Sequence, residues 1–104
     1  MGELASSDLV VEIDDGPPVT FRVAGDVDIE SSPRLRSAVD DVIGRGGVAA
    51  VRFDLSAVEF LDSSGLAVLI AAENAGAQVS VCVPSPAARL AITACGLDHL
   101  LSDA

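Results

Sequence analysis

The sequence predicts one α/β domain with a mostly parallel central β-sheet, an N-terminal antiparallel hairpin and helices mainly on one face. Strand-like and helix-like segments alternate along the chain and are joined by short connections, which favours parallel pairing after the hairpin. The 104 residues suit a single domain, residues 1–104, and we expect residues 1–7 to lack fixed structure. Half of the residues are apolar but only three are aromatic, so the core must consist mainly of aliphatic side chains.

The hairpin is predicted from two strand-like segments that flank a turn. Residues 9–13 are apolar and mostly β-branched, and residues 14–18 follow with the turn sequence Asp-Asp-Gly-Pro-Pro. Residues 19–24 then alternate apolar and more polar side chains, which indicates a strand with one buried face. We expect Gly25 to end this strand.

A first helix is predicted after the hairpin, and the central strand after that helix. Ser32 offers an N-cap, Pro33 suits the first helical position, apolar residues recur at helical spacing, and Gly44 offers a stop. Residues 48–55 form a nearly continuous apolar run, which is typical of an interior strand covered on both faces over most of its length.

The second half of the chain predicts two more helices and one more strand. A strongly apolar helix begins near Ser63 and ends before Gly76, and residues 78–83 read as a strand. Ser85 is then expected to cap a helix over residues 86–95, with an apolar tail that packs back as a last helical turn.

The charge of the chain limits its partners. Sixteen acidic residues outnumber six basic ones, all of them Arg, and the formal net charge is -10. Because binding to DNA or RNA needs a basic stripe that neutralises phosphates, the sequence argues against nucleic acid as a partner. An acidic surface suits a basic protein partner, although solubility alone explains the charge equally well.

The chain is expected to be cytoplasmic and to have no direct membrane insertion. Its N-terminus lacks a basic start followed by an apolar stretch, and the longest apolar run, residues 66–72, is far below the roughly 20 residues of a membrane span. Cys82 and Cys95 show no metal-ligand spacing and are interpreted as reduced, buried thiols. No cofactor or metal motif occurs, so neither group is expected.

One segment carries chemistry, namely Asp62-Ser63-Ser64-Gly65, where the central strand passes into an apolar helix. The first amides of a helix lack partners within the helix, so Asp62 or Ser63 could cap them and an anion such as phosphate could also bind there. A nucleophile elbow needs Gly two residues before and after the serine, and neither serine has both. The one histidine, His99, is interpreted as a half-buried structural residue, and no catalytic residue is assigned.

A second polar segment, Gly25-Asp26-Val27-Asp28, comes between the second strand and the first helix. It could be no more than a capped turn. In a parallel sheet, however, this loop and the Asp62 loop both follow the C-terminal ends of their strands. We therefore expect both acidic loops to lie on one rim and to frame Ser63.

These motifs, together with Pro84-Ser85-Pro86 through Leu90 to Gly96-Leu97, resemble the STAS domain over nearly the whole chain. The family is named for sulphate transporters and anti-sigma factor antagonists. The resemblance implies a STAS-type fold and makes Ser63, the serine directly after the motif's aspartate, the phosphorylation site. It implies a partner surface that comprises Asp26, Asp28, Asp62, Ser64, Gly65 and Leu66.

The resemblance also implies a non-enzymatic function. The unphosphorylated protein would bind an anti-sigma factor that is itself a serine kinase and thereby free a sigma factor. Phosphorylation would end this binding, and a serine phosphatase would restore it. One alternative keeps the fold and makes the chain a non-phosphorylated adaptor in a membrane transport or stress-signalling complex. A more remote alternative is a serine hydrolase.

Overall fold

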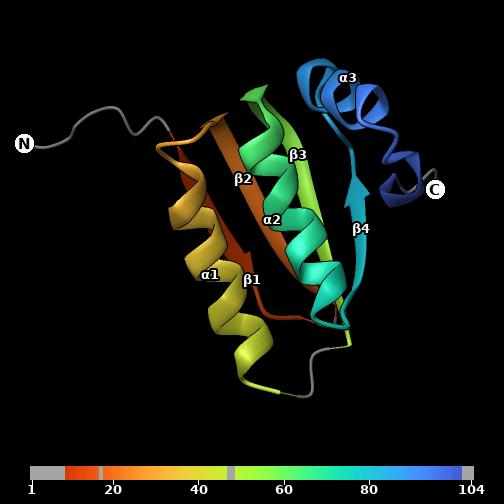
Figure 1. Ribbon diagram of the computed structural model, residues 1–104. Coiled ribbons are helices and arrows are strands. Elements are labelled where there is room, and N and C mark those ends of the chain that lie inside the picture. Colours follow the sequence, from red (N-terminus) through yellow and green to blue (C-terminus); the bar gives the residue numbers. More distant parts are fainter. Residues whose placement is uncertain (1–8, 17, 47–48, 102–104) are drawn as a thin grey trace, which may run out of the picture.

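The residues that the structure describes, 9–16, 18–46 and 49–101 of this computed structural model, form a four-stranded sheet in the order β1-β2-β3-β4 (Figure 1). β1 pairs antiparallel with β2, and the other neighbours pair in parallel. The predicted class and the hairpin are therefore confirmed. Residues 1–7 lie outside the described residues. The elements are β1 Val10–Asp14, β2 Val19–Val27, α1 Ser32–Gly44, β3 Ala50–Leu61, α2 Ser63–Asn74, β4 Gln78–Cys82, α3 Pro86–Ala94 and the short 3-10 helix η1 Asp98–Leu100.

Helices α1 and α2 lie side by side over one face of the sheet, and α3 lies beyond the C-terminal end of β4 (Figure 1). The core lies between these helices and the sheet. Phe21 of β2 and Phe53 of β3 are both fully buried there and stack with ring centroids 5.2 Å apart. The predicted placement of the helices mainly on one face is confirmed.

The central strand is not covered on both faces, so that prediction was wrong. Along β3, Val51, Phe53 and Leu55 are buried while Arg52 and Ser56 are exposed. Because side chains alternate between the two faces of a strand, this pattern means that the helices cover one face and leave the other open.

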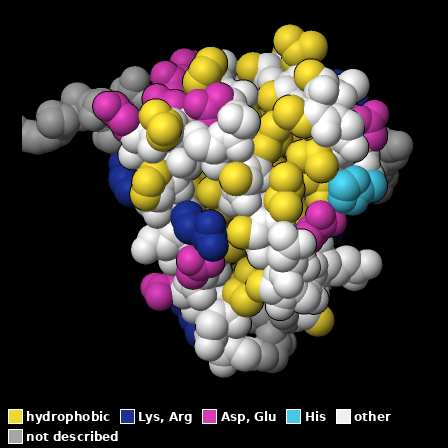
Figure 2. Space-filling model, viewed as in Figure 1, with side chains coloured by type: hydrophobic (Ala, Val, Ile, Leu, Met, Phe, Trp, Pro, Cys, Tyr) yellow, Lys and Arg dark blue, Asp and Glu magenta, His cyan; other side chains and the backbone are white. Residues whose placement is uncertain are grey.

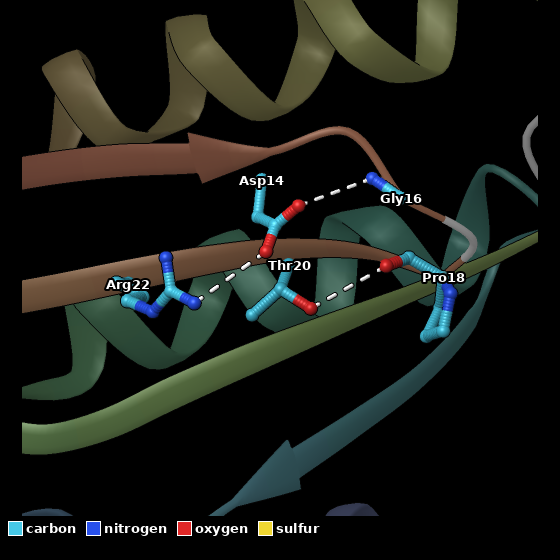
Figure 3. Close-up of polar contacts among 5 residues, drawn as sticks. All are labelled: Asp14, Gly16, Pro18, Thr20 and Arg22. Atoms are coloured by element: carbon cyan, nitrogen blue, oxygen red, sulfur yellow. Dashed lines mark hydrogen bonds and ion pairs between the residues drawn. The ribbon is translucent and has the colours of Figure 1, made fainter.

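The hairpin carries polar contacts at its turn and across its strands (Figure 3). One carboxylate oxygen of Asp14 accepts from the backbone N–H of Gly16 at 3.2 Å, and the other accepts from Arg22 on β2 at 3.4 Å. The Thr20 hydroxyl donates to the carbonyl oxygen of Pro18 at 3.4 Å. Asp14, predicted in the turn, is the last residue of β1.

Strands β2 and β3 both extend further than predicted. Gly25 does not end β2, which runs to Val27, and β3 continues past residue 55 to Leu61. The pairing of the two strands shifts register on both sides of Ala24 and Gly25, and Gly25 has a φ of +95°, which only glycine adopts readily. The glycine therefore permits an irregularity within the strand. The predicted start of the central strand at Val48 lies outside the described residues.

The three helices begin at Ser32, Ser63 and Pro86, as predicted. Two details at α1 differ. Its N-cap residue is Ser31, whose side chain does not cap the helix, and Gly44 is the last helical residue, so the chain turns away through Gly46 at a φ of +80°.

The end of the chain follows the prediction with small differences. The Ser85 hydroxyl accepts from the backbone N–H of Ala88 at 3.1 Å and caps α3, and η1 supplies the expected last turn. Cys82 is partly exposed and Cys95 is exposed, and both are free thiols. The expectation of buried thiols was wrong, since Cys95, the C-cap residue of α3, is exposed and Cys82, the last residue of β4, is only partly buried. In the described part of the chain, no helix is long and apolar enough to cross a membrane.

Candidate functional site

The ends of β2 and β3 bring the two acidic segments together, as the parallel sheet predicts. Val27 pairs with Leu61, and the backbone N–H of Asp62 donates to the carbonyl oxygen of Val27 at 3.2 Å. The turn between β2 and α1 therefore lies beside the start of α2, and the two segments share one rim.

Asp62 is the N-cap of α2. Its Oδ1 accepts from the backbone N–H groups of Ser64 at 2.9 Å and Gly65 at 3.3 Å, and also from the Ser64 hydroxyl. Of the two capping residues that the sequence left open, the structure selects Asp62. The first free amides of the helix thus already have an anionic partner.

Ser63 is the first residue of α2 and is exposed. Its hydroxyl makes no hydrogen bond with any described residue, whereas the neighbouring Ser64 hydroxyl is bound to Asp62. The two adjacent serines therefore differ in availability, and Ser63 presents the free hydroxyl.

A network of hydrogen bonds fixes the turn between β2 and α1. Oδ1 of Asp28 accepts from the backbone N–H groups of Ser31 at 2.9 Å and Glu30 at 3.0 Å. The Ser31 hydroxyl accepts from the backbone N–H of Asp28 at 2.9 Å and lies 2.8 Å from the carbonyl oxygen of Asp26. The hydrogen bonds from the backbone and hydroxyl of Ser31, with a further one from Glu30, lower the pKa of Asp28 below its usual value of 3.8.

Comparison with known proteins assigns the family. The model of the STAS domain matches residues 8–102, which is nearly the whole chain. This chain belongs to the STAS domain family. Its structure is similar to the crystal structure of an anti-sigma factor antagonist from Mycobacterium paratuberculosis, with 30% sequence identity and a TM-score of 0.83 over 96% of this chain and 90% of that one.

Two solved structures of SpoIIAA share the fold. The unphosphorylated form of this anti-sigma factor antagonist matches with a TM-score of 0.78 at 22% identity, over 91% of this chain and 88% of that one. The phosphorylated form, from Bacillus, matches with a TM-score of 0.70 at 22% identity, over 91% of each chain.

Two of the residues predicted to contact a partner, Gly65 and Leu66, lie at the start of α2, where this helix of the STAS domain packs against the sheet. A Cβ atom on Gly65 would lie 2.5 Å from Leu61 Cδ1 and 2.7 Å from Val27 Cγ1, so α2 packs directly on the two strand ends. Leu66 is 3% exposed and belongs to the core. The Leu66 side chain is therefore not at the surface, and Gly65 has no side chain, because this helix start approaches the sheet closely.

Asp26 lies within β2 and not in the loop where the sequence placed it. It pairs with Phe60 of β3, next to the pair Val27 and Leu61 whose side chains are buried. Because neighbouring residues of a strand point to opposite faces, Asp26 and Phe60 lie on the open face of the sheet, at the edge of the rim.

Two exposed apolar residues of the rim, Ile29 and Phe60, were not among the predicted site residues. Ile29, in the turn before α1, is 75% exposed, and Phe60 is 49% exposed. A signal existed for Ile29, since a large aliphatic residue between Asp28 and Glu30 is unexpected in a polar turn.

His99 is not placed to act on Ser63. Its Nε2 lies 3.1 Å from Oε2 of Glu73, near the other end of α2 and about 15 Å along the helix from Ser63. The side chain is 57% exposed, so the predicted half-buried histidine is instead a surface residue that links η1 to α2. Among the described residues, no three His, Cys, Asp or Glu side chains cluster as metal ligands would.

Proposed function

We propose that this STAS domain is an anti-sigma factor antagonist and that a partner anti-sigma factor, acting as a serine kinase, phosphorylates Ser63. The observation that carries the proposal is the exposed Ser63 hydroxyl, free of hydrogen bonds to the described residues, beside an Asp62 that caps the helix without it. The similarity to the Mycobacterium antagonist, at 30% identity over nearly both chains, supports the same function. SpoIIAA, which shares the fold, has been solved in unphosphorylated and phosphorylated forms.

In this proposal the unphosphorylated protein binds the anti-sigma factor in the cytoplasm and releases a sigma factor. The contact surface includes Asp26, Asp28, Asp62 and Ser64 around Ser63. Asp28 uses Oδ1 for the turn, while Oδ2 makes no hydrogen bond with a described residue and can accept one from the partner.

Phosphorylation ends binding through charge. A phosphate adds a charge of about -1.5 to -2. The amides of Ser64 and Gly65 are already bound to Asp62, so the new phosphate projects from the surface instead of taking their hydrogen bonds. It would then lie in the interface next to the Asp62 carboxylate, and an unpaired charge buried in an interface costs several kcal/mol. The fold remains because Ser63 does not cap the helix, and a serine phosphatase resets the switch.

The test is incubation of the protein with candidate anti-sigma kinases and ATP, followed by intact-mass analysis and mapping of the phosphate. Wild type and Ser64→Ala should each gain one phosphate, and Ser63→Ala should gain none. Ser64→Ala is the matched control because it removes the same hydroxyl one residue later. Phosphate on Ser64 alone would overturn the assignment.

Binding provides the second readout. Wild type should bind the anti-sigma factor, and Ser63→Asp should fold but bind poorly. If both bound a partner equally well, Ser63 would not be a switch. Recovery of transporter subunits in place of an anti-sigma factor would instead indicate the adaptor function.

A further inference from the structure

We propose that Ile29 is the principal apolar anchor of the surface around Ser63, and that the partner offers it an apolar pocket with a basic rim. This inference rests on the proposed function and specifies how the partner is recognised.

The exposure of Ile29 is the first observation. At 75%, it is the most exposed of the large hydrophobic side chains in the described part of the chain. Isolated apolar residues are common on protein surfaces, but Ile29 lies in the turn that follows Val27, whose carbonyl oxygen accepts from the backbone N–H of Asp62 next to Ser63. Its burial would remove apolar surface from water on the same rim as Ser63.

The rigidity of the turn is the second observation. The residues on both sides of Ile29, namely Asp28 and Glu30, are joined when Oδ1 of Asp28 accepts from the Glu30 backbone N–H. Ser31 closes the turn through its own N–H to Asp28 and through a hydroxyl that lies 2.8 Å from the Asp26 carbonyl oxygen. An anchor on such a turn loses little conformational freedom on binding, which favours affinity.

Phe60 adds a second apolar contact on the other segment of the rim. It is 49% exposed and precedes Leu61 and Asp62, so apolar side chains flank the site on β3 as well as on the turn. The two residues come from different elements of the same rim, and a partner that covers the rim can contact both.

The charge around these anchors specifies the partner. Residues 26–31 and 59–63 contain five carboxylates and no basic side chain, and the five are Asp26, Asp28, Glu30, Glu59 and Asp62. Figure 2 shows acidic side chains gathered with hydrophobic ones over the end of the molecule where β2 passes into α1. An apolar centre with an acidic rim is complementary to an apolar pocket surrounded by Arg or Lys, and such charges accelerate association.

The experiment compares Ile29→Ala with Ile13→Ala in binding to the cognate anti-sigma factor by surface plasmon resonance. Ile13 is the matched control, because it is 42% exposed on β1 and pairs with Phe21, six residues before Val27 along β2. Ile29→Ala should weaken binding by about tenfold or more, as truncation of an interface anchor does, and Ile13→Ala by less than about twofold. Thermal unfolding should be close to wild type for Ile29→Ala and slightly lower for Ile13→Ala, since alanine is less favoured than isoleucine in a strand.

The charge component is tested with Glu30→Gln and with Asp41→Asn as a control on the exposed surface of α1. Glu30→Gln should lower the association rate severalfold at low salt and make it less dependent on salt, whereas Asp41→Asn should do neither. If wild type binds but Ile29→Ala binds as tightly, the anchor is refuted and the proposed function stands. If wild type binds no anti-sigma factor, both proposals fail.

Discussion

The backbone N–H of Asp62 donates a hydrogen bond of 3.2 Å to the carbonyl oxygen of Val27, so the start of α2 is tied to the end of β2. Since Asp62 caps α2 and Val27 precedes the turn that carries Asp28, this bond joins the two segments of the rim. The geometry around Ser63 therefore depends on the pairing of β2 with β3 more than on flexible loops.

Because Asp62 caps α2 and Ser63 does not, substitutions at these two residues should affect stability differently. Asp62→Ala removes the acceptor for two backbone N–H groups and should lower the free energy of unfolding by about 1 kcal/mol. Ser63→Ala removes a hydroxyl that caps nothing and should change it by less than about 0.5 kcal/mol. Urea unfolding of both variants measures this difference. Equal losses would mean that Ser63 shares the capping role.

The close approach of α2 to the strands predicts that Gly65→Ala is destabilising. The added Cβ would lie 2.5 Å from Leu61 Cδ1, and overpacking of this kind costs about 1 to 3 kcal/mol. Gly44→Ala is the control, since a Cβ there meets nothing within 4 Å and alanine favours a helix by up to about 1 kcal/mol. Thermal and urea unfolding should show a loss for Gly65→Ala only. A neutral Gly65→Ala would show that the helix can move away from the sheet.

Local signals were sufficient to predict the order of the elements and the starts of the helices. Alternation marked the buried face of β2, and a Ser-Pro or Asp-Ser pair marked each helix start. The shared rim followed from parallel pairing alone, because the C-terminal ends of parallel strands meet at one edge of the sheet.

The extents of β2 and β3 were not predictable from local sequence. Gly25 has the sequence character of a strand breaker, and its tolerance within β2 depends on a register shift against β3. The same holds for burial at the site. The burial of Leu66 follows from how closely the start of α2 approaches the core, which local sequence does not show, whereas the position of Ile29 between two acidic residues was a local signal.

The pKa of Asp28 is lowered by hydrogen bonds within its turn, so removing one of these bonds should change how Asp28 titrates. Ser31→Ala removes the hydroxyl that interacts with the Asp28 carboxylate, so the pKa of Asp28 should rise toward its usual value of 3.8. NMR titration of the side-chain carboxyl carbon measures this shift. Ser37→Ala, on the exposed surface of α1, should leave the titration unchanged.

The lowered pKa of Asp28 also determines the pH range in which its carboxylate stabilises the folded protein. A carboxyl with a lowered pKa binds its proton more weakly in the folded state, so its contribution to stability is present above the usual value of 3.8. The contribution is lost as the pH falls through the lowered pKa. The stability difference between wild type and Ser31→Ala should therefore shrink on acidification, and a difference that grew would contradict the interpretation.

The backbone of Val83, between β4 and α3, predicts a stabilising substitution. Val83 has a φ of +49° and is 64% exposed. Left-handed backbone costs an L-residue roughly 1 to 2 kcal/mol and is least suited to β-branched side chains, whereas asparagine tolerates it. Val83→Asn should therefore raise the free energy of unfolding by about 1 kcal/mol in urea unfolding. Val10→Asn is the control, because Val10 is 53% exposed in a regular strand where valine is favoured, and it should be destabilising. If both variants were destabilised equally, the side chain of Val83 would contribute packing that outweighs its backbone strain.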